Sequence, residues 1–151
     1  RSGCHVVINA DRNHKDHNGS KEVVTSNNSF ATFNELAKDI SSSEVDGISL
    51  VSLFRQPDQK LNRESIFDTS SYHGFGLGPQ GAIRKGKYKL IEWFEKSAFN
   101  KTGAFELYDL EKDSCERQNL ASDKSKTTNQ LKQELQDWQS KVNAQMMTKA
   151  Q

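Results

Sequence analysis

The chain has 151 residues, of which 33% are hydrophobic and 27% charged, and 21 basic against 20 acidic residues leave a formal net charge of +1. Such a balance gives no overall field toward nucleic acid or an anionic membrane, and no apolar run approaches the roughly 20 residues that cross a bilayer. Two cysteines, Cys4 and Cys115, are too few for a disulfide framework or a four-ligand zinc site. The low hydrophobic fraction predicts a modest core, and we expect a larger protein to complete it.

The first part of the chain predicts short elements joined by polar segments. Residues 6–8, Val-Val-Ile, are typical of a short buried strand, and a strongly polar loop follows at residues 11–20. Residues 30–37 carry apolar side chains at every third position, which predicts a short amphipathic helix capped by Ser26 or Asn27. After a serine linker, residues 45–54 predict a turn into a second short helix that is buried on one side.

Residues 81–121 hold most of the large apolar side chains and predict a meander of two or three antiparallel strands. A short strand at residues 65–69 and a glycine-rich loop at residues 74–79 precede the meander. Lys85-Gly86 is the natural position for a tight turn, and residues 96–103 predict a longer polar connection between strands.

The clearest helix begins near Ser125. Its apolar side chains form one continuous stripe at helical spacing: Leu131, Leu135, Trp138 and Val142. Ser122 or Asp123 can cap its start. Because such a stripe needs a surface to cover, the sequence predicts an α+β fold in which a small antiparallel sheet is packed by a long C-terminal helix.

Two strings have the form of known ligand sites, but loops explain them better. Residues 76–81 match G-x-G-x-x-G, yet Pro79 interrupts the string and a strand follows where a phosphate site needs a helix. Residues 11–22 are rich in acidic and histidine side chains. However, Lys15 and Asp16 stand where a calcium loop needs a ligand and a glycine.

Two candidate binding sites remain. A basic cluster beside Tyr88 suits sulfate or phosphate, or is simply the solvated face of a strand: Arg84, Lys85, Lys87 and Lys89. His73, next to Tyr72, is the most site-like single residue, because a loop histidine can bind a substrate oxygen or an anion. A merely exposed histidine is the alternative. Cys115 has no base nearby in the sequence, so nucleophilic catalysis is not expected there.

Several motifs, taken in order, resemble the C-terminal subdomain of type I sulfatases, the arylsulfatase-like hydrolases. Residues 81–91, GAIRKGKYKLI, resemble the family's R-x-G-x-Y-K-L-I. Residues 106–121 resemble its L-Y-D-L-x-x-D-P-G-E-x-x-N-L-A, and Trp138 fits the tryptophan of its last helix. Upstream, residues 24–37 resemble V-x-S-x-D-x-x-P-T-L-x-E-L-A, and residues 45–50 resemble D-G-x-S-L. The resemblance therefore extends over nearly the whole chain.

The sequence departs from this family at several positions. Ala31 replaces a proline, Asn28 an acid, and Ser114-Cys115 a Pro-Gly pair. The resemblance implies a formylglycine made in a C/S-x-P-S/A-x-R motif, a calcium ion, and sulfate-binding histidines and lysines. That motif is absent from the sequence. If residues 1–6 correspond to the family's E-G-G-x-R-V-P segment, the chain begins just after the last catalytic lysine.

No catalytic residue, metal ligand or cofactor is therefore assigned to this chain, and calcium and formylglycine are expected in a missing catalytic domain. In the family, the loop before Gly81 lies near the cleft and can touch substrate. The resemblance thus implies substrate-binding roles for Tyr72 and His73, to which the basic cluster adds Arg84.

We expect residues 1–44 to be the end of a sulfatase catalytic α/β domain and residues 45–151 to be the C-terminal α+β subdomain. The partner would be the N-terminal catalytic domain, the substrate a sulfate ester of an aryl alcohol or a carbohydrate, and the isolated chain inactive. The resemblance implies a periplasmic, secreted or lysosomal location. The alternatives are a non-catalytic α+β module that binds sulfated or anionic glycans and a degenerate gene product.

Overall fold

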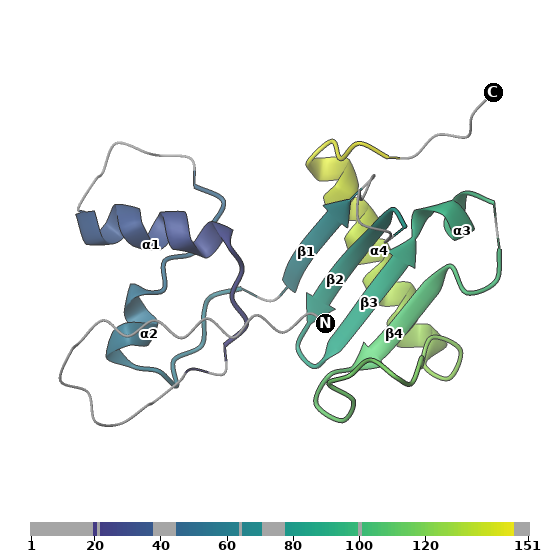
Figure 1. Ribbon diagram of the computed structural model, residues 1–151, viewed down its shortest axis with the longest axis horizontal. Coiled ribbons are helices and arrows are strands. Elements are labelled where there is room, and N and C mark those ends of the chain that lie inside the picture. Colours follow the sequence, from purple (N-terminus) through teal and green to yellow (C-terminus); the bar gives the residue numbers. More distant parts are fainter. Residues whose placement is uncertain are drawn as a thin grey trace. The chain divides into compact units, whose positions relative to one another are not determined.

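The computed structural model describes residues 20, 22–37, 45–63, 65–70, 78–99 and 101–146 (Figure 1). The chain divides into two compact units, residues 1–62 and residues 63–151. The expected strand at residues 6–8 and the serine linker lie outside the described residues. The expected boundary after residue 44, between a catalytic domain and the C-terminal subdomain, stays a prediction.

The described residues form helices in both units and strands in the second unit. The helices are α1 (Asn27–Ala37), α2 (Val51–Arg55), α3 (Phe94–Ala98) and α4 (Ser125–Lys141), and the strands are β1 (Ser65–Ser70), β2 (Gln80–Lys85), β3 (Tyr88–Trp93) and β4 (Phe105–Asp109). Across the described ranges, no helix has the length and apolar character needed to span a membrane.

Polar contacts hold the first unit together. Asn28 of α1 is fully buried: its Oδ1 accepts from the Thr25 N–H at 2.7 Å, and its Nδ2 donates to the Ile48 carbonyl at 2.8 Å. The Thr32 hydroxyl donates to the Asn28 carbonyl at 2.6 Å and accepts from the Leu50 N–H at 2.9 Å. The inner face of α1 is therefore polar, with each side chain hydrogen-bonded.

The apolar side of α1 is exposed. Phe30, Phe33 and Leu36 are 58%, 67% and 56% exposed, respectively. The predicted amphipathic helix is confirmed, and its apolar side chains are exposed rather than buried within this unit. Because three large apolar side chains on one helix face are costly to leave in water, this stripe has the character of an interface.

A small apolar core completes the first unit. Leu50, Leu53 and Leu61 are buried, and partly buried side chains pack around them: Val24, Ile48 and Phe54. The loop before α2 touches α1 through its backbone, because a Cβ placed on Gly47 would lie 2.1 Å from the Asn27 carbonyl oxygen. Only glycine allows this approach.

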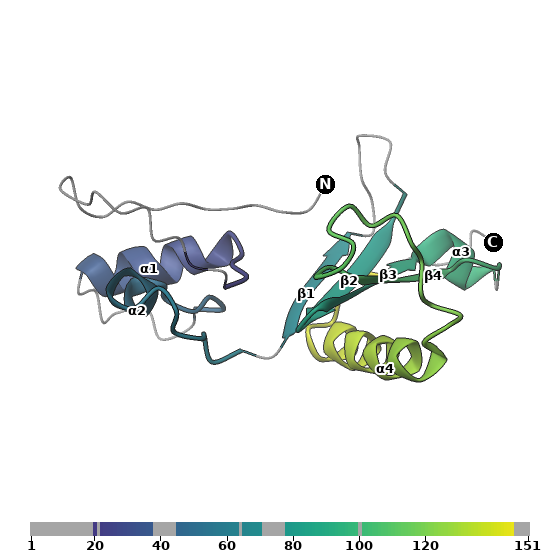
Figure 2. The same ribbon diagram turned by 90° about the horizontal axis from the view of Figure 1, so that it is seen from below.

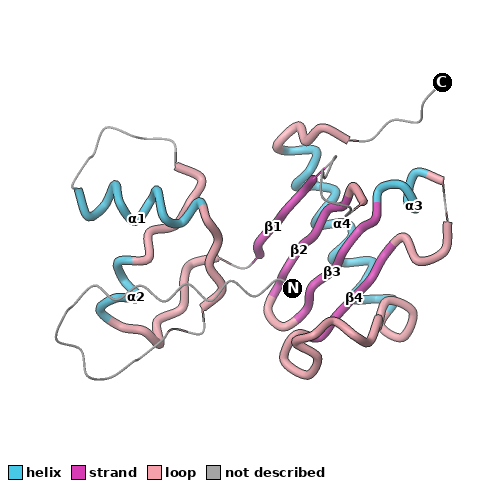
Figure 3. The backbone as a smooth tube through the Cα atoms, viewed as in Figure 1, coloured by secondary structure: helices cyan, strands magenta, loops and turns pink. Residues whose placement is uncertain are grey.

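The second unit is a four-stranded antiparallel sheet with the order β1-β2-β3-β4, so each strand pairs with its neighbour in sequence (Figure 3). Gly86 has φ +55° in the two-residue turn between β2 and β3, as predicted. Together with α4, the sheet confirms the predicted α+β class.

Helix α4 packs against one face of the sheet, called here the helix face (Figure 2). Its core contains Ile83, Leu90, Leu107, Leu131 and Leu135, each at most 3% exposed. Burial of each such side chain contributes about 1.5–3 kcal/mol. At the edge of this core, the Phe67 and Trp138 rings stack with their centroids 4.9 Å apart.

The ends of α4 differ from the prediction. Val142 lies beyond the helix and is 49% exposed, whereas Gln139, only 5% exposed, occupies the position that follows Leu135 on the buried side. The predicted caps Ser122 and Asp123 are wrong, because Lys124 holds the N-cap position without a side-chain hydrogen bond.

A short helix interrupts the predicted polar connection after β3. Helix α3 begins at Phe94, which is buried at 3% exposure. The Phe94 N–H donates to the Pro79 carbonyl at 3.0 Å, so the turn is joined to the start of β2.

Candidate functional site

The face of the sheet opposite α4, called here the second face, carries the candidate substrate residue Arg84. The strand register aligns Ile66, Arg84, Lys89 and Tyr108 in one row across the sheet. Side chains directly opposite each other in antiparallel strands share a face, so each of these side chains lies beside the next one in the row.

The structure separates the basic cluster. Each lysine in it has its own carboxylate partner: Lys85 pairs with Glu134 at 2.9 Å, Lys87 with Asp109 at 3.4 Å, and Lys89 with Glu116 at 2.8 Å. Asp109 also holds the pKa of Lys87 above its usual value. Lys85 reaches α4 on the helix face, whereas Lys89 lies on the second face, so the four basic residues do not form one common surface.

Arg84 differs from these lysines. Its Nε is buried and has no hydrogen-bond partner, and no ion pair of Arg84 occurs among the described residues. A buried guanidinium donor without an acceptor is uncommon. Arg84 is thus the cluster member without a carboxylate partner among the described residues. Tyr72 and His73 lie outside the described residues, so their proximity to Arg84 stays a prediction.

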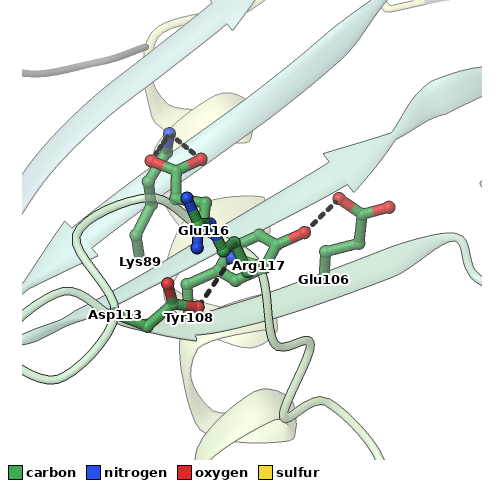
Figure 4. Close-up of polar contacts among 6 residues, drawn as sticks. All are labelled: Lys89, Glu106, Tyr108, Asp113, Glu116 and Arg117. Atoms are coloured by element: carbon green, nitrogen blue, oxygen red, sulfur yellow. Dashed lines mark hydrogen bonds and ion pairs between the residues drawn. The ribbon is translucent and has the colours of Figure 1, made fainter.

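Figure 4 shows two polar contacts on the second face, made by side chains of β3 and β4. The Lys89 ammonium bonds both carboxylate oxygens of Glu116, at 2.8 and 3.0 Å, and the Tyr108 hydroxyl donates to Glu106 at 2.9 Å. Burial raises the pKa of Tyr108 to about 12, and the hydrogen bond to Glu106 adds to the shift. Tyr108 is therefore a neutral hydrogen-bond donor at physiological pH rather than a base.

The residues that carry the family resemblance after β4 serve the backbone. Asp113 Oδ2 accepts from the Arg117 and Gln118 N–H groups, both at 2.7 Å. Asn119 Oδ1 accepts from the Leu107 N–H at 3.0 Å and from the Ala121 N–H at 2.9 Å. The motif thus fixes the path of the chain from β4 to α4 and has no visible role in chemistry.

A cavity of about 330 Å³ lies at the C-terminal end of α4, and sequence analysis missed it. Its lining is mostly polar: Glu92, Gln136, Gln139, Ser140 and Asn143, with Ala144 and Met146. Glu92 Oε1 accepts from the Ser97 hydroxyl at 2.7 Å, whereas Glu92 Oε2 and Gln139 Nε2 are buried without partners. Two residues could have indicated this cavity: the carboxylate Glu92 on the helix face of β3, and Gln139, which follows Leu135 by four residues in α4.

A second cavity, of about 270 Å³, lies beside the turn between β2 and β3. Lys87, Lys112 and Lys124 line it together with Asp109 and Asp113. The ammonium groups of Lys87 and Lys124 lie 5.3 and 5.9 Å from the centre of the Tyr88 ring. The cavity is therefore of mixed charge with a small positive excess.

Among the described residues, no group of three or more His, Cys, Asp or Glu side chains could hold a metal ion. Gly81 lies in β2 rather than before a helix, which argues against the dinucleotide string. Cys115 is exposed and unpaired with another cysteine.

Comparison with known proteins identifies the family. A sequence profile described as "N-sulphoglucosamine sulphohydrolase, C-terminal" matches residues 5–141 of the chain. The chain belongs to this family. A search of the curated proteins finds no significant match.

Solved structures agree with a sulfatase C-terminal domain. A protein from Bacteroides thetaiotaomicron assigned to the sulfatases is 26% identical, with a TM-score of 0.60, over 78% of this chain and 26% of its own. A 2-O GAG sulfatase is 28% identical, with a TM-score of 0.60, over 75% of this chain and 24% of its own. A third structure, in complex with its substrate D-glucosamine-2-N,6-O-disulfate, is 22% identical (TM-score 0.57) over 73% of this chain and 22% of its own, which shows the shared fold.

The chain thus spans about a quarter of the length of these structures. It is the sulfatase C-terminal domain that the resemblance implied, and its ordered motifs are structural elements of that domain.

Proposed function

We propose that this domain works as part of a sulfatase that hydrolyses sulfate esters of a carbohydrate, joined to an N-terminal catalytic domain. The match of the family profile to residues 5–141 carries the proposal. Two similar structures support the substrate class, because one is named as a 2-O GAG sulfatase and another holds a disulfated glucosamine. We place the protein in a periplasmic, secreted or lysosomal compartment.

The chemistry is assigned to the catalytic domain. We place formylglycine and calcium upstream, as the resemblance to the sulfatases implies. The isolated chain is accordingly inactive, and its role is to complete the fold and one side of the substrate cleft.

The exposed stripe of α1 is the proposed contact with that catalytic domain. Phe30, Phe33 and Leu36 each expose more than half of their surface, while the opposite side of α1 is already satisfied by hydrogen bonds. Burial of three such side chains against an apolar surface would contribute several kcal/mol, roughly 1.5–3 kcal/mol each.

Arg84 is the proposed substrate contact of the described sheet, together with Tyr72 and His73. A guanidinium group binds sulfate oxygens through paired N–H donors, and its burial strengthens the interaction. Support comes from the Arg84 Nε, which is buried without an acceptor.

The test is a sulfatase assay on two proteins: this chain alone and the chain preceded by its catalytic domain. With an aryl sulfate and a sulfated disaccharide, we expect calcium-dependent turnover only in the longer protein. Calcium-dependent turnover by the chain alone, or none by the longer protein with any sulfated substrate, would contradict the proposal.

Arg84→Gln in the longer protein tests the substrate contact. We expect KM to rise about tenfold, with a smaller change in kcat, because loss of a charged hydrogen bond costs about 1.5–3 kcal/mol. Lys126→Ala, an exposed position of α4, is the matched control and should leave both constants unchanged. An unchanged KM in Arg84→Gln would remove Arg84 from the site.

The second candidate function is a non-catalytic module that binds anionic glycans. The cavity with Lys87, Lys112 and Lys124 favours it, as does the unpaired Arg84 Nε. Heparin binding by the isolated chain at low salt, lost when Arg84→Ala is combined with Lys87→Ala, would support this function. Absence of binding at low salt would exclude it.

A further inference from the structure

We propose that the cavity at the C-terminal end of α4 binds a neutral sugar ring through its hydroxyl groups. The cavity measures about 330 Å³, which lies within the range of small-molecule sites. Its polar lining consists of one carboxylate, three amides and one hydroxyl: Glu92, Gln136, Gln139, Asn143 and Ser140. This site is separate from the second face that carries Arg84.

Two buried atoms of this lining are without partners. Glu92 is 4% exposed and Gln139 is 5% exposed, yet neither Glu92 Oε2 nor Gln139 Nε2 makes a hydrogen bond. Buried polar atoms are nearly always paired with protein or with a bound molecule. Both residues line the cavity, and their unpaired acceptor and donor are removed from bulk water.

The chemistry of these two atoms selects the ligand. A carboxylate oxygen accepts and an amide nitrogen donates, so the ligand must donate to Glu92 and accept from Gln139. Hydroxyl groups do both, whereas an ammonium group only donates. A sulfate group only accepts and would lie beside the Glu92 carboxylate, with no cationic side chain in the lining to offset the repulsion. A ring with neighbouring hydroxyls fits best.

The surrounding structure fixes both groups. Glu92 lies in β3, and the Ser97 hydroxyl of α3 holds its other carboxylate oxygen. Gln139 can approach the sheet because Gly81 lacks a side chain: a Cβ there would lie 2.8 Å from Gln139 Nε2 and 3.0 Å from the Phe94 ring. Glu92 and Gln139 are thus held by a strand and a helix, whereas Asn143, Ala144 and Met146 of the lining follow the end of α4.

Sugar binding as such does not depend on the proposed sulfatase activity. A further step does rest on that function. In this step, the bound ring is an unsulfated unit of the same glycan from which the catalytic domain removes sulfate. A binding measurement on this chain therefore fails or succeeds independently of the sulfatase assay.

The experiment is an NMR titration of the full chain with D-galactose and N-acetyl-D-glucosamine. We expect millimolar binding, as for other single-ring ligands, with shifts confined to the amides near Glu92, Ser97 and Gln139.

Glu92→Gln should weaken binding about tenfold, because a hydrogen bond to a charged acceptor is lost. Asn143→Gly should also weaken binding. Because Asn143 has φ +51°, glycine can keep the same backbone conformation there. This variant therefore tests the proposal if Glu92→Gln fails to fold. Gln133→Ala, an exposed position of α4 outside the cavity, is the control and should bind normally.

Several results would overturn the proposal. These are no shift with either sugar, equal binding by the folded variants, or tighter binding of glucosamine, glucose 6-sulfate or N-methylacetamide than of the neutral sugars. A crystal structure grown with sugar that shows only an ordered water on Glu92 Oε2 would do the same.

Discussion

Lys89 on β3 and Glu116 in the turn after β4 form an ion pair in which the ammonium lies 2.8 and 3.0 Å from the two carboxylate oxygens (Figure 4). The two side chains are only 15% and 20% exposed. Glu116 has φ +56°, a left-handed backbone conformation that costs a residue with a Cβ about 1 kcal/mol. The pair therefore offsets local strain and joins the turn to the second face of the sheet.

Lys89→Met should lower the free energy of unfolding by about 1–3 kcal/mol, because it leaves a partly buried carboxylate without its cation. Urea denaturation of the chain measures this change. Glu116→Gln should cost a similar amount, and the two losses should not add in the double variant. Additive losses would mean that the two residues act separately. Glu111→Gln, an exposed acid of the same turn, is the control.

The pKa of Tyr108 predicts a loss of stability at high pH. Tyr108 is 8% exposed, and its pKa rises from 10.0 to about 12 because burial and Glu106 favour the neutral phenol. This contribution to stability is fully present below pH 10 and is lost as the pH rises through about 12. The total loss is about 2–3 kcal/mol.

Comparison with Tyr108→Phe isolates this effect. The stability advantage of the natural chain over the variant should shrink between neutral pH and pH 12, and Glu106→Gln should lower the pKa seen in the tyrosinate absorbance. A difference that stays constant with pH would refute the shifted pKa.

Gly47→Ala should unfold the first unit selectively. A methyl group there would lie 2.1 Å from the Asn27 carbonyl oxygen, so the backbone must move at a cost of about 1–3 kcal/mol or more. NMR signals of α1 and α2 should lose their dispersion while those of the sheet persist. Gly86→Ala is the contrasting variant: it meets no atom within 4 Å and strains only the turn between β2 and β3. Equal loss in both units after Gly47→Ala would show that the units do not unfold separately.

Phe33→Ser tests the proposed contact of α1 with a catalytic domain. In the isolated chain this 67% exposed side chain should matter little, within about 0.5 kcal/mol. In the protein that includes the catalytic domain, the same change should lower the unfolding midpoint, because it removes buried apolar area. Glu35→Gln, also exposed on α1, should be neutral in both proteins. A neutral Phe33→Ser in the longer protein would argue against this interface.

Periodicity identified the elements but not their surroundings. Leu131 and Leu135 are core residues of α4 as expected, because sheet and helix lie in the same unit. Phe30 and Phe33 have equally clear helical spacing, yet they are exposed, since nothing in the pattern says whether the covering surface lies in the same chain. The sequence does contain a signal for the early end of α4, because asparagine commonly follows the last turn of a helix. Asn143 takes φ +51°, and the Ala144 N–H donates to the Gln139 carbonyl at 2.9 Å.

The candidate sites were less accessible to sequence reasoning. Residue type alone placed Arg84 in a basic cluster, but the partner of Lys85 is Glu134, on a helix far along the chain. Only the strand register and helix packing separate Arg84 from its neighbours. The unpaired atoms of Glu92 and Gln139 depend likewise on contacts between distant segments.

The order of the strands has a consequence for how this domain can diversify. Each strand pairs with its neighbour in sequence, so residues 71–79, which connect β1 to β2 and include Tyr72 and His73, need only close a hairpin. Doubling the length of such a connection costs about 0.6 kcal/mol in closure entropy. Insertions there would leave the sheet and α4 intact. Homologues can therefore exchange this segment without redesigning the scaffold.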